Sequence, residues 1–550
     1  MGTRAHLVKS GVGLFGLAAI FGVLHPLSVR ADTVYVAPGG SGDGSAADPF
    51  GSVQTALENA DPGDQVSIAS GTYSETVETV RDGEASAPIV MRGAGNDGPV
   101  VLTASGRVVR IDHAHVRLEN LTIDGQYGDR DAVDVNDGAD GLVLRNVEIR
   151  RSGRDCLDMG APSGVLIEDS LIHHCLDSRD GRTDAHGITG GAVTELTVRN
   201  TEIHTFSGDG LQFDPGRELP GWNNIVIEGC LIWLAPLAAA ENGFAAGTVP
   251  GENGVDTKTN NDAPRADLVI RDSVFYGFSD GMISNMAALN LKENVDVEID
   301  RVTLYDSQIA LRLRGPTSSR PAGAWVRVAN TVIYRVEVAV RYEDDIENLR
   351  IWNTTIGAQV DQPFVEAAAE NSVLDVRNLL VLAATLPVEA PANENLAVGE
   401  DSFVDPAAGD HHLAATSAAI DSGNAIAAIT WDRDGLARPQ GAAIDIGAYE
   451  WCGPDCEPVA DPDGSVPHDA SGAKDGASSA KDGGADGGTD GGSASSGHGQ
   501  SGCSCRTPAR TPTRRPAVSM SPLRNLSRLM LYGLWFLFGM LAVCLLRRPK

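Results

Sequence analysis

Glu119-Asn120-Leu121-Thr122-Ile123 is the first of ten copies of one short phrase. In each copy a polar or small residue, often Asn or Asp, is followed by two residues and then by Ile, Val, Leu or Phe. The other copies are RNVEI from 145, EDSLI from 168, RNTEI from 199, EGCLI from 228, RDSVF from 271, DRVTL from 300, ANTVI from 329, WNTTI from 352 and RNLLV from 377. Successive copies lie 26, 23, 31, 29, 43, 29, 29, 23 and 25 residues apart. Such a period indicates stacked units that cannot bury their apolar sides alone.

The residues before several copies predict strands rather than helices. Apolar and polar positions alternate with a period of two over residues 141–144 and 224–227, which puts one set of side chains inside and the other in water. We therefore expect an all-β protein, with a right-handed parallel β-helix of about ten or more rungs over residues 32–456. Each turn of this coil would bury its inner face and pair with the next turn.

The N-terminal region predicts export and a cap. Residues 1–31 have the order of a secretory signal peptide, with early basic residues, an apolar run over 11–24 and a cleavage site at Ala31. Farther on, four apolar residues at helical spacing predict a short helix, and these are Val53, Ala56, Leu57 and Ala60. A helix at this point would cover the open edge of the first rung.

The C-terminal region differs in composition from the repeats. Residues 457–500 are mostly Asp, Gly, Ser, Ala and Lys without apolar periodicity, which predicts a disordered linker. Residues 501–550 contain an apolar run over 529–546 that is long enough for a transmembrane helix, followed by basic residues. Together with the Gly-Cys-Ser-Cys box at 502–505, this tail resembles the sorting tails of myxobacterial surface proteins. The resemblance implies processing near Cys503 and cell-surface display; a permanent membrane anchor is the alternative.

Composition limits the partners. The net charge of −31 argues against nucleic acid as a ligand, and we expect a monomer. Eight cysteines in 550 residues do not make a disulfide scaffold. We expect a local disulfide between Cys452 and Cys456, and buried packing roles for Cys156, Cys175 and Cys230.

Most rungs carry a further strand after the phrase, and we aligned these strands by their inward apolar residues. Equivalent outward residues on neighbouring rungs should stack about 4.8 Å apart. The central predicted column is Asp158, Thr189, Gln212, Asp256, Ile283, Arg312 and Arg341. The two flanking columns are Asp214, Lys258, Asn285, Arg314 and Glu343 on one side, and Asp155, His186, Asp209, Asn253 and Asp280 on the other. A carboxylate-rich patch thus passes into a basic patch on one face, beside the long insert at 231–250.

Acids beside bases suit an acidic polysaccharide. Calcium can bridge Asp carboxylates to a uronate carboxylate, which makes the proton on the adjacent carbon easier to remove. A Lys or Arg within reach can then accept that proton, and expulsion of the C4 oxygen completes a β-elimination. Lys serves as a base only where burial or neighbouring cations lower its pKa.

Three segments resemble β-helix pectate lyases of the lysine-base type: TDAHG at 183–187, GDGLQFD at 208–214 and ENGVDTK at 252–258. Segments 418–423 and 444–450 resemble the closing part of the same proteins. The resemblance implies calcium ligands at Asp184, Asp209 and Asp214 and a base at Lys258. The chain departs from the family pattern because Asp256 holds the usual position of the lysine, and because Asp-Ala-His-Gly replaces Ala-Asp-Gly.

The sequence therefore predicts a calcium-dependent polysaccharide lyase that acts on a uronic-acid polymer. The predicted metal ligands are Asp184, Asp209, Asp214 and Asp256. The predicted catalytic residues are Lys258 and Arg314, and the predicted substrate-binding residues are Arg312, Asn285 and Gln212. Two alternatives stay open, namely a non-catalytic surface protein that binds glycans or cells, and a glycoside hydrolase that uses Asp209 and Asp214 with Asp184.

Overall fold

The computed structural model describes residues 31–95, 98–179, 184–216, 220–368 and 370–453. The predicted signal peptide up to residue 30, the linker and the sorting tail lie outside these ranges. Within the described ranges, no helix is long and apolar enough to cross a membrane. The predicted span at 529–546 lies outside the described ranges.

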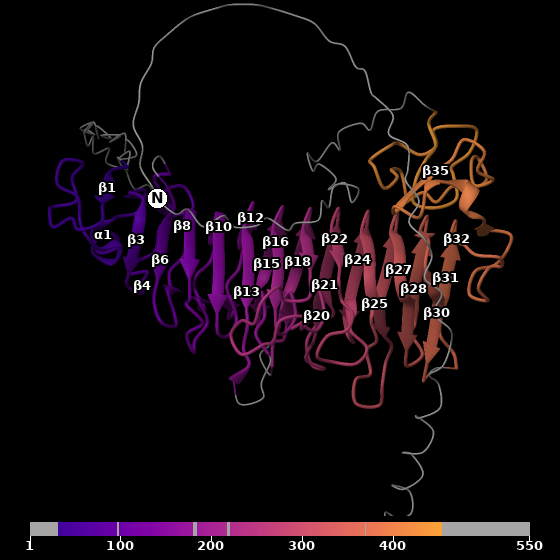
Figure 1. Ribbon diagram of the computed structural model, residues 1–550, viewed down its shortest axis with the longest axis horizontal. Coiled ribbons are helices and arrows are strands. Elements are labelled where there is room, and N and C mark those ends of the chain that lie inside the picture. The colour runs from indigo at the N-terminus through magenta and orange to yellow at the C-terminus, as the bar shows by residue number, and fades with distance from the viewer. Residues whose placement is uncertain (1–30, 96–97, 180–183, 217–219, 369, 454–550) are drawn as a thin grey trace, which may run out of the picture. The chain divides into compact units, whose positions relative to one another are not determined.

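The described chain winds into a parallel β-helix, in which each strand pairs with the equivalent strand one rung later (Figure 1). The strands form three faces. Face 1 stacks β1 (Thr33–Val36), β2 (Gln65–Ile68), β5 (Ile89–Gly93), the starts of β8 (Val116–Asp124) and β10 (Val143–Ser152), β12 (Leu166–Glu168), β15 (Thr194–Arg199), β18 (Asn223–Glu228), β21 (Ala266–Arg271), β24 (Val295–Asp300), β26 (Trp325–Ala329), β28 (Asn348–Trp352) and β31 (Leu374–Arg377).

Face 2 stacks β3 (Gly71–Ser74), β6 (Val100–Thr103), the ends of β8 and β10, β13 (Leu171–Cys175), β16 (Glu202–Phe206), β19 (Leu231–Trp233), β22 (Val274–Tyr276), the starts of β25 (Thr303–Arg314) and β27 (Val332–Glu343), β29 (Thr355–Ile356), β32 (Leu380–Leu382) and β33 (Leu396–Val398). Face 3 stacks β4 (Val77–Glu78), β7 (Val109–Ile111), β9 (Val133–Val135), β11 (Leu157–Met159), β14 (Ile188–Gly190), β17 (Leu211–Phe213), β20 (Val255–Thr257), β23 (Ala287–Leu291), the ends of β25 and β27, and β30 (Val360–Ala367). The all-β prediction is confirmed.

The corner between faces 1 and 2 explains the repeated phrase. Its second residue has a positive φ, between 44° and 61°, in all ten copies: Asn120, Asn146, Asp169, Asn200, Gly229, Asp272, Arg301, Asn330, Asn353 and Asn378. Asn, Asp and Gly tolerate this left-handed conformation better than other residues, so the chain can turn sharply there. Arg301 is the exception, and two hydrogen bonds of 2.7 Å from its guanidinium to Asp272 in the previous rung hold it in place.

The fifth residue of the phrase points into the core. These side chains form an inward column that is at most 1% exposed, and its members are Ile123, Ile149, Ile172, Ile203, Ile232, Phe275, Leu304, Ile333, Ile356 and Val381. Each contributes about 1.5–3 kcal/mol by burial. Since a slip of one residue would turn the column outward, it also fixes the register of face 2.

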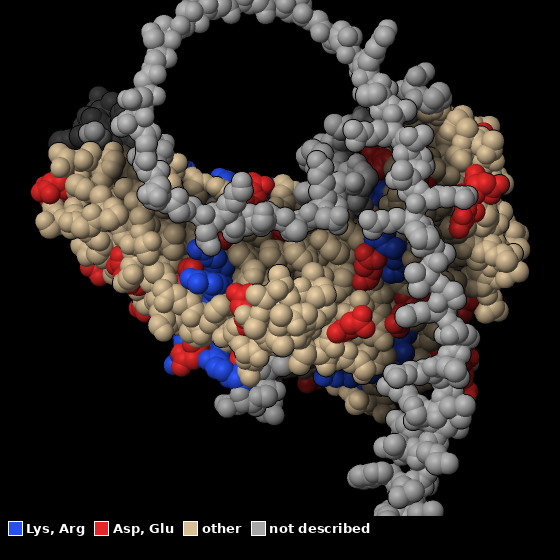
Figure 2. Space-filling model, viewed as in Figure 1, with Lys and Arg blue, Asp and Glu red and all other residues tan. Residues whose placement is uncertain are grey.

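The first residue of the phrase forms a charged column on face 1. Its sign alternates over seven rungs, through Glu119, Arg145, Glu168, Arg199, Glu228, Arg271 and Asp300. Neighbours in the column pair across rungs, as in Arg145–Glu168 at 2.5 Å and Arg271–Glu228 at 3.1 Å. Figure 2 likewise shows acidic and basic side chains next to one another on the visible surface. The net negative charge therefore coexists with local charge pairing.

Both ends of the coil are covered. Helix α1 (Val53–Asn59) lies where the sequence predicts a cap; the hydroxyl of Ser52 accepts a hydrogen bond from the Thr55 amide, and Val53, Ala56 and Leu57 are buried. At the other end, the 3₁₀ turn Glu400–Ser402 and the antiparallel strands β34 (Phe403–Asp405) and β35 (Asp410–Leu413) begin a closing segment that continues to residue 450.

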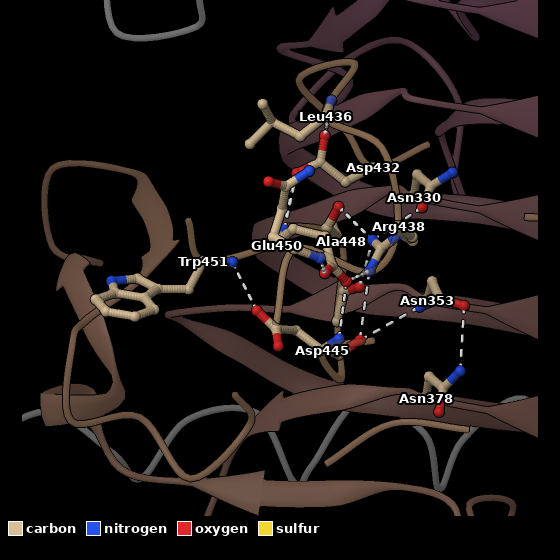
Figure 3. Close-up of polar contacts among 12 residues, drawn as sticks. Asn330, Asn353, Asn378, Asp432, Leu436, Arg438, Asp445, Ala448, Glu450 and Trp451 are labelled. Atoms are coloured by element: carbon tan, nitrogen blue, oxygen red, sulfur yellow. Dashed lines mark hydrogen bonds and ion pairs between the residues drawn. The ribbon is translucent and has the colours of Figure 1, made fainter. Parts of the chain in front are cut away.

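Arg438 anchors the closing segment on the corner of the β-helix (Figure 3). Its guanidinium, buried completely, donates to Glu450 at 2.7 Å and to Asn330 at 3.0 Å, and also to the Ala448 carbonyl at 2.8 Å. The closing segment therefore contacts asparagine side chains of the corner directly, and it acts as a structural closure.

The cysteine predictions are partly wrong. Cys156 and Cys175 form a disulfide with a Cα–Cα distance of 5.5 Å, because Cys175 at the end of β13 pairs with Ser152 on the previous rung, shortly before Cys156. Because these cysteines fall within the rungs, we expected packing roles for them. Cys230 is free and buried, as predicted. Cys452 is disulfide-bonded, and its predicted partner Cys456 lies outside the described residues.

Candidate functional site

The candidate site lies on the outer surface of face 3 in the middle rungs. Loops from the two neighbouring corners flank this surface, and Figure 1 shows long loops at the lower ends of the strands in the middle rungs. The insert after β19 folds back over earlier rungs, where Leu237 and Phe244 pack on Leu176. The hydroxyl of Ser178 donates to the carbonyl of Asn242 at 2.5 Å and ties the insert to the loop after β13.

The register confirms the predicted central column except in one rung. Paired residues along face 3 are Asp134, Asp158, Thr189, Gln212, Asp256, Asn290, Arg312 and Arg341. Asn290 replaces the predicted Ile283, because residues 281–285 form a loop and the strand begins only at Ala287. Apolar and polar residues do not alternate in the run Ala287–Leu291 before Asn290. The sequence pattern therefore gave no sign that this run is a strand.

The same shift corrects one flanking column. The position that the sequence assigns to Asn285 belongs to Lys292, two residues after Asn290, so this column places Lys292 between Lys258 and Arg314. Ala287 likewise stands where Asp280 was predicted. Asn285 still reaches the surface from its loop, since Arg341 donates to its side-chain oxygen at 3.4 Å.

Two lysines meet at one carboxylate. Lys292 Nζ lies 2.7 Å from Asp256 Oδ1, and Lys258 Nζ lies 3.9 Å from Asp256 Oδ2 and 3.4 Å from Asp214 Oδ2. Asn290 also donates to Asp256 at 2.9 Å. Lys258 and Lys292 are the only lysines between residues 31 and 453. In the other ion pairs of the described ranges, apart from those of histidine, the cation is arginine.

Burial and charge act against each other at this pair. Burial, together with the nearby Asp209, raises the pKa of Asp256 to about 6 in spite of the lysines. Burial by itself lowers the pKa of Lys258, but Asp256 and Asp214 outweigh it, so the net shift is upward. The resting site therefore keeps Lys258 protonated at neutral pH.

The acids of the preceding rungs surround His186. Its Nδ1 lies 2.8 Å from Asp155, while its Nε2 lies 3.3 Å from Asp184 and 3.7 Å from Asp209. Burial lowers the pKa of His186, but hydrogen bonds to Asp155 and Asp184 outweigh burial and raise it to about 10. A buried imidazolium thus neutralises this part of the site.

The predicted arginines bind a shared carboxylate. Arg312 and Arg341 both contact Glu343 Oε1, at 3.0 and 2.6 Å, and Arg314 lies 3.7 Å from Glu343 Oε2. Burial raises the pKa of Glu343, yet Arg312 and Arg341 outweigh burial and lower it overall. The basic patch is therefore held in place by an acid from its own last rung.

Glu252 is a site residue that we did not single out from the sequence. It is partly buried at the end of the insert, and burial together with Asp209 and Asp184 raises its pKa to about 7. A carboxyl group with such a pKa can exchange a proton near neutral pH. Only its place between the insert and the Asn253-Gly254 turn hinted at this role.

The four predicted calcium ligands do not surround a common point. Asp184 and Asp209 face His186, whereas Asp214 and Asp256 face Lys258. Across the part of the chain that the structure describes, no three His, Cys, Asp or Glu side chains are arranged to hold a metal ion. The donor set in this arrangement does not fit calcium, which needs six to eight oxygen ligands.

Comparisons with known proteins found partial similarities. No family model matches the chain. Pectate lyase PEL9 of Emericella nidulans is 34% identical over 86 residues, which are 15% of this chain and 21% of that relative, so the match spans about a fifth of the relative.

Three solved structures are similar to this chain at low sequence identity and with TM-scores below 0.5. Pectate lyase Pel9A is 18% identical with a TM-score of 0.44, over 76% of this chain and 96% of that one. An alginate lyase from Paenibacillus sp. is 17% identical with a TM-score of 0.38, over 62% and 99%. The A-module of a mannuronan C-5 epimerase from Azotobacter vinelandii is 16% identical with a TM-score of 0.41, over 63% and 98%.

Proposed function

We propose that this chain is a polysaccharide lyase that cleaves a uronic-acid polymer by β-elimination on face 3. The convergence of the only two lysines of residues 31–453 on Asp256 carries the proposal. Lysine can lose its proton and act as a base, which arginine cannot do in proteins. A fold that needed cations only for ion pairs could use arginine here, as it does elsewhere. The local match to a pectate lyase supports the same conclusion.

The reaction assigns a task to each side chain. Lys258, as the neutral amine, takes the proton from the carbon next to the uronate carboxyl group. The electron pair of that C–H bond forms the new C4–C5 double bond as the C4–O bond breaks, and the leaving oxygen departs with the other half of the polymer and takes a proton from water. Lys292 and Arg312 stabilise the carboxylate as charge develops on it, and Arg314 lies on the next rung where it can assist. Gln212 and Asn285 contribute hydrogen bonds to the sugar.

The resemblance to pectate lyases implies calcium, but none of these side-chain tasks requires the ion. A calcium ion would neutralise the substrate carboxylate when bound. In this chain the lysines and arginines of the middle rungs supply positive charge at the same surface.

A non-catalytic glycan-binding role is the second candidate, and one observation favours it. Asp256 and Asp214 raise the pKa of Lys258, which suits a cation that binds carboxylates better than it suits a base. Glycoside hydrolysis is not proposed, because Asp209 is only 1% exposed and both of its oxygens accept hydrogen bonds from Asn253 or Gln212.

We further propose that the protein is exported and displayed at the cell surface, with its tail anchored in a membrane or processed near Cys503. The Cys156–Cys175 disulfide supports export, since such bonds persist mainly in oxidising compartments. A monomeric chain would then bind the acidic polymer outside the cell.

The function is tested by the ultraviolet absorbance of unsaturated uronate ends. Polygalacturonate, alginate and a neutral glucan would be incubated with the purified chain, with calcium or with chelator. We expect absorbance to grow with a uronate polymer only, and to disappear in Lys258→Ala. Arg327→Gln, on face 1, is the matched control and should keep full activity. A rate unaffected by Lys258→Ala would reject Lys258 as the base, and no absorbance on any uronate polymer would favour the binding role.

A further inference from the structure

The deepest carboxylates of the site already have protein partners. Oδ1 of Asp209 accepts hydrogen bonds from the backbone and side chain of Asn253 at 3.0 and 2.8 Å, and Oδ2 accepts one from Gln212 at 2.8 Å. Oδ1 of Asp256 lies 2.9 Å from the Asn290 amide nitrogen and 2.7 Å from Lys292 Nζ, which also lies 2.8 Å from Oδ2.

A calcium ion would have to break these contacts. It binds oxygen atoms at about 2.3–2.6 Å, and six to eight of them are needed. Ligation by Asp256 would bring the ion next to the Lys292 ammonium, and ligation by Asp209 would displace its hydrogen bonds from Asn253 and Gln212. Like charges at such distances repel strongly in a partly buried site.

The protein supplies an equivalent charge of its own. Lys258 and Lys292 stand on adjacent rungs, and their two ammonium groups carry the same total charge as one divalent cation. Asp256 lies between them and is 3% exposed, whereas the lysine side chains are 35% and 22% exposed. The Asp256 carboxylate is thus buried beneath the two lysines, whose ammonium groups are accessible to solvent.

Both ammonium groups keep donors for a ligand. An ammonium group has three hydrogens, and Lys292 directs its own toward a single carboxylate, Asp256. The distances of 3.4 and 3.9 Å from Lys258 to its acids are longer than a strong charge-assisted hydrogen bond, which measures about 2.7–2.9 Å. By contrast, the neighbouring Arg312 is directed at Glu343.

We propose that Lys292, supported by Asp256, takes the place of a divalent cation and binds the carboxylate of an acidic sugar directly, and that Lys258 adds to this binding while it is protonated, before it loses its proton for turnover. The choice of ligand rests on the proposed function. Lys292 becomes a substrate-binding residue that the sequence pattern did not reveal, and binding of the sugar requires no calcium.

Binding is measured apart from turnover. Trigalacturonate and trimannuronate would be titrated calorimetrically into the full chain, once with chelator and once with about 1 mM calcium, roughly the free level that extracellular calcium sites are tuned to. We expect one of the two to bind with the same Kd, within about twofold, in both conditions. Lys292→Met should weaken binding by about tenfold or more, the change expected for one lost charge-assisted hydrogen bond. Arg327→Gln on face 1 should bind as the wild type does.

A folding control keeps the result interpretable. Lys292→Met leaves Asp256 without its nearest cation, so the double variant Asp256→Asn with Lys292→Met removes both charges and should melt near the wild type while still failing to bind. Binding that appears only with calcium, or that survives Lys292→Met, overturns the inference, as does an absence of binding by both trisaccharides. Calcium-free binding without any unsaturated product leaves the inference standing and rejects the lyase.

Discussion

Removal of the Arg438 side chain should release the closing segment from the β-helix. Arg438→Met keeps the apolar stem but deletes a guanidinium that is 0% exposed and donates to Glu450, Asn330 and the Ala448 carbonyl. Breaking one partner out of a buried ion pair costs about 3–5 kcal/mol, because the remaining charge stays buried without compensation. Burial lowers the pKa of Arg438, but its acidic neighbours oppose the shift, so the native group is charged.

The loss should appear as local opening. The Gly447 amide donates to the Asn378 carbonyl and the Ala448 amide donates to the Thr355 hydroxyl, both at 2.9 Å, so these amides report docking of the segment. About 3 kcal/mol corresponds to roughly a 150-fold larger opening constant. Hydrogen exchange followed by mass spectrometry should therefore show peptides over 445–450 exchanging roughly 150-fold faster, while peptides of the middle rungs stay unchanged.

The matched control is Arg377→Met at the same end of the coil. Arg377 pairs with Asp375 at 2.6 Å, but its side chain is 44% exposed, and such surface pairs contribute about 0–1 kcal/mol. Exchange at 445–450 should change less than about fivefold in this control. A change equally small in Arg438→Met would show that the buried guanidinium does not hold the segment.

Three further predictions concern the disulfide and the lysine pair. Replacing Cys156 and Cys175 with Ser should cost about 3 kcal/mol of unfolding free energy, the value for closing a loop of this size, and urea titration checks it; no loss would mean that the crosslink is dispensable. The lyase rate should rise with pH from neutral into the alkaline range, because Lys258 accepts a proton only as the neutral amine and its pKa is raised; a plateau above about pH 7 would instead assign the base to Glu252. Asp256→Asn should move the alkaline rise to lower pH, since Asp256 helps to raise the pKa of Lys258; an unmoved profile would uncouple the two residues.

Much of the fold was predictable from the sequence, because the repeat arises from the conformation that the chain must adopt at each corner. The residue at the corner must adopt a left-handed conformation, so Asn, Asp or Gly recurs there, and the inward apolar residue recurs three positions later. Alternating Glu and Arg at the first position of the phrase was a further readable signal, which we did not use. The cap at α1 was also predictable, since its spacing is helical and its N-cap is Ser52.

The site was less predictable from the sequence, because the register of a strand that follows an irregular loop is not determined by the residues next to it. The chain passes through a loop at 279–286 before β23, and the pattern resumes in a run of apolar residues that does not alternate. Lys292 therefore escaped notice, although a count of lysines would have drawn attention to it. The Cys156–Cys175 disulfide likewise depends on the register between two rungs, which places Cys175 opposite Ser152.

A crystal structure of Lys258→Ala with trigalacturonate or trimannuronate, grown in chelator, tests the central claim most directly. We expect a sugar carboxylate within hydrogen-bond distance of Lys292, with the neighbouring C–H bond pointing to the space that the Lys258 side chain leaves. A sugar bound on another face, or one held by a metal ion between the aspartates, would contradict the account.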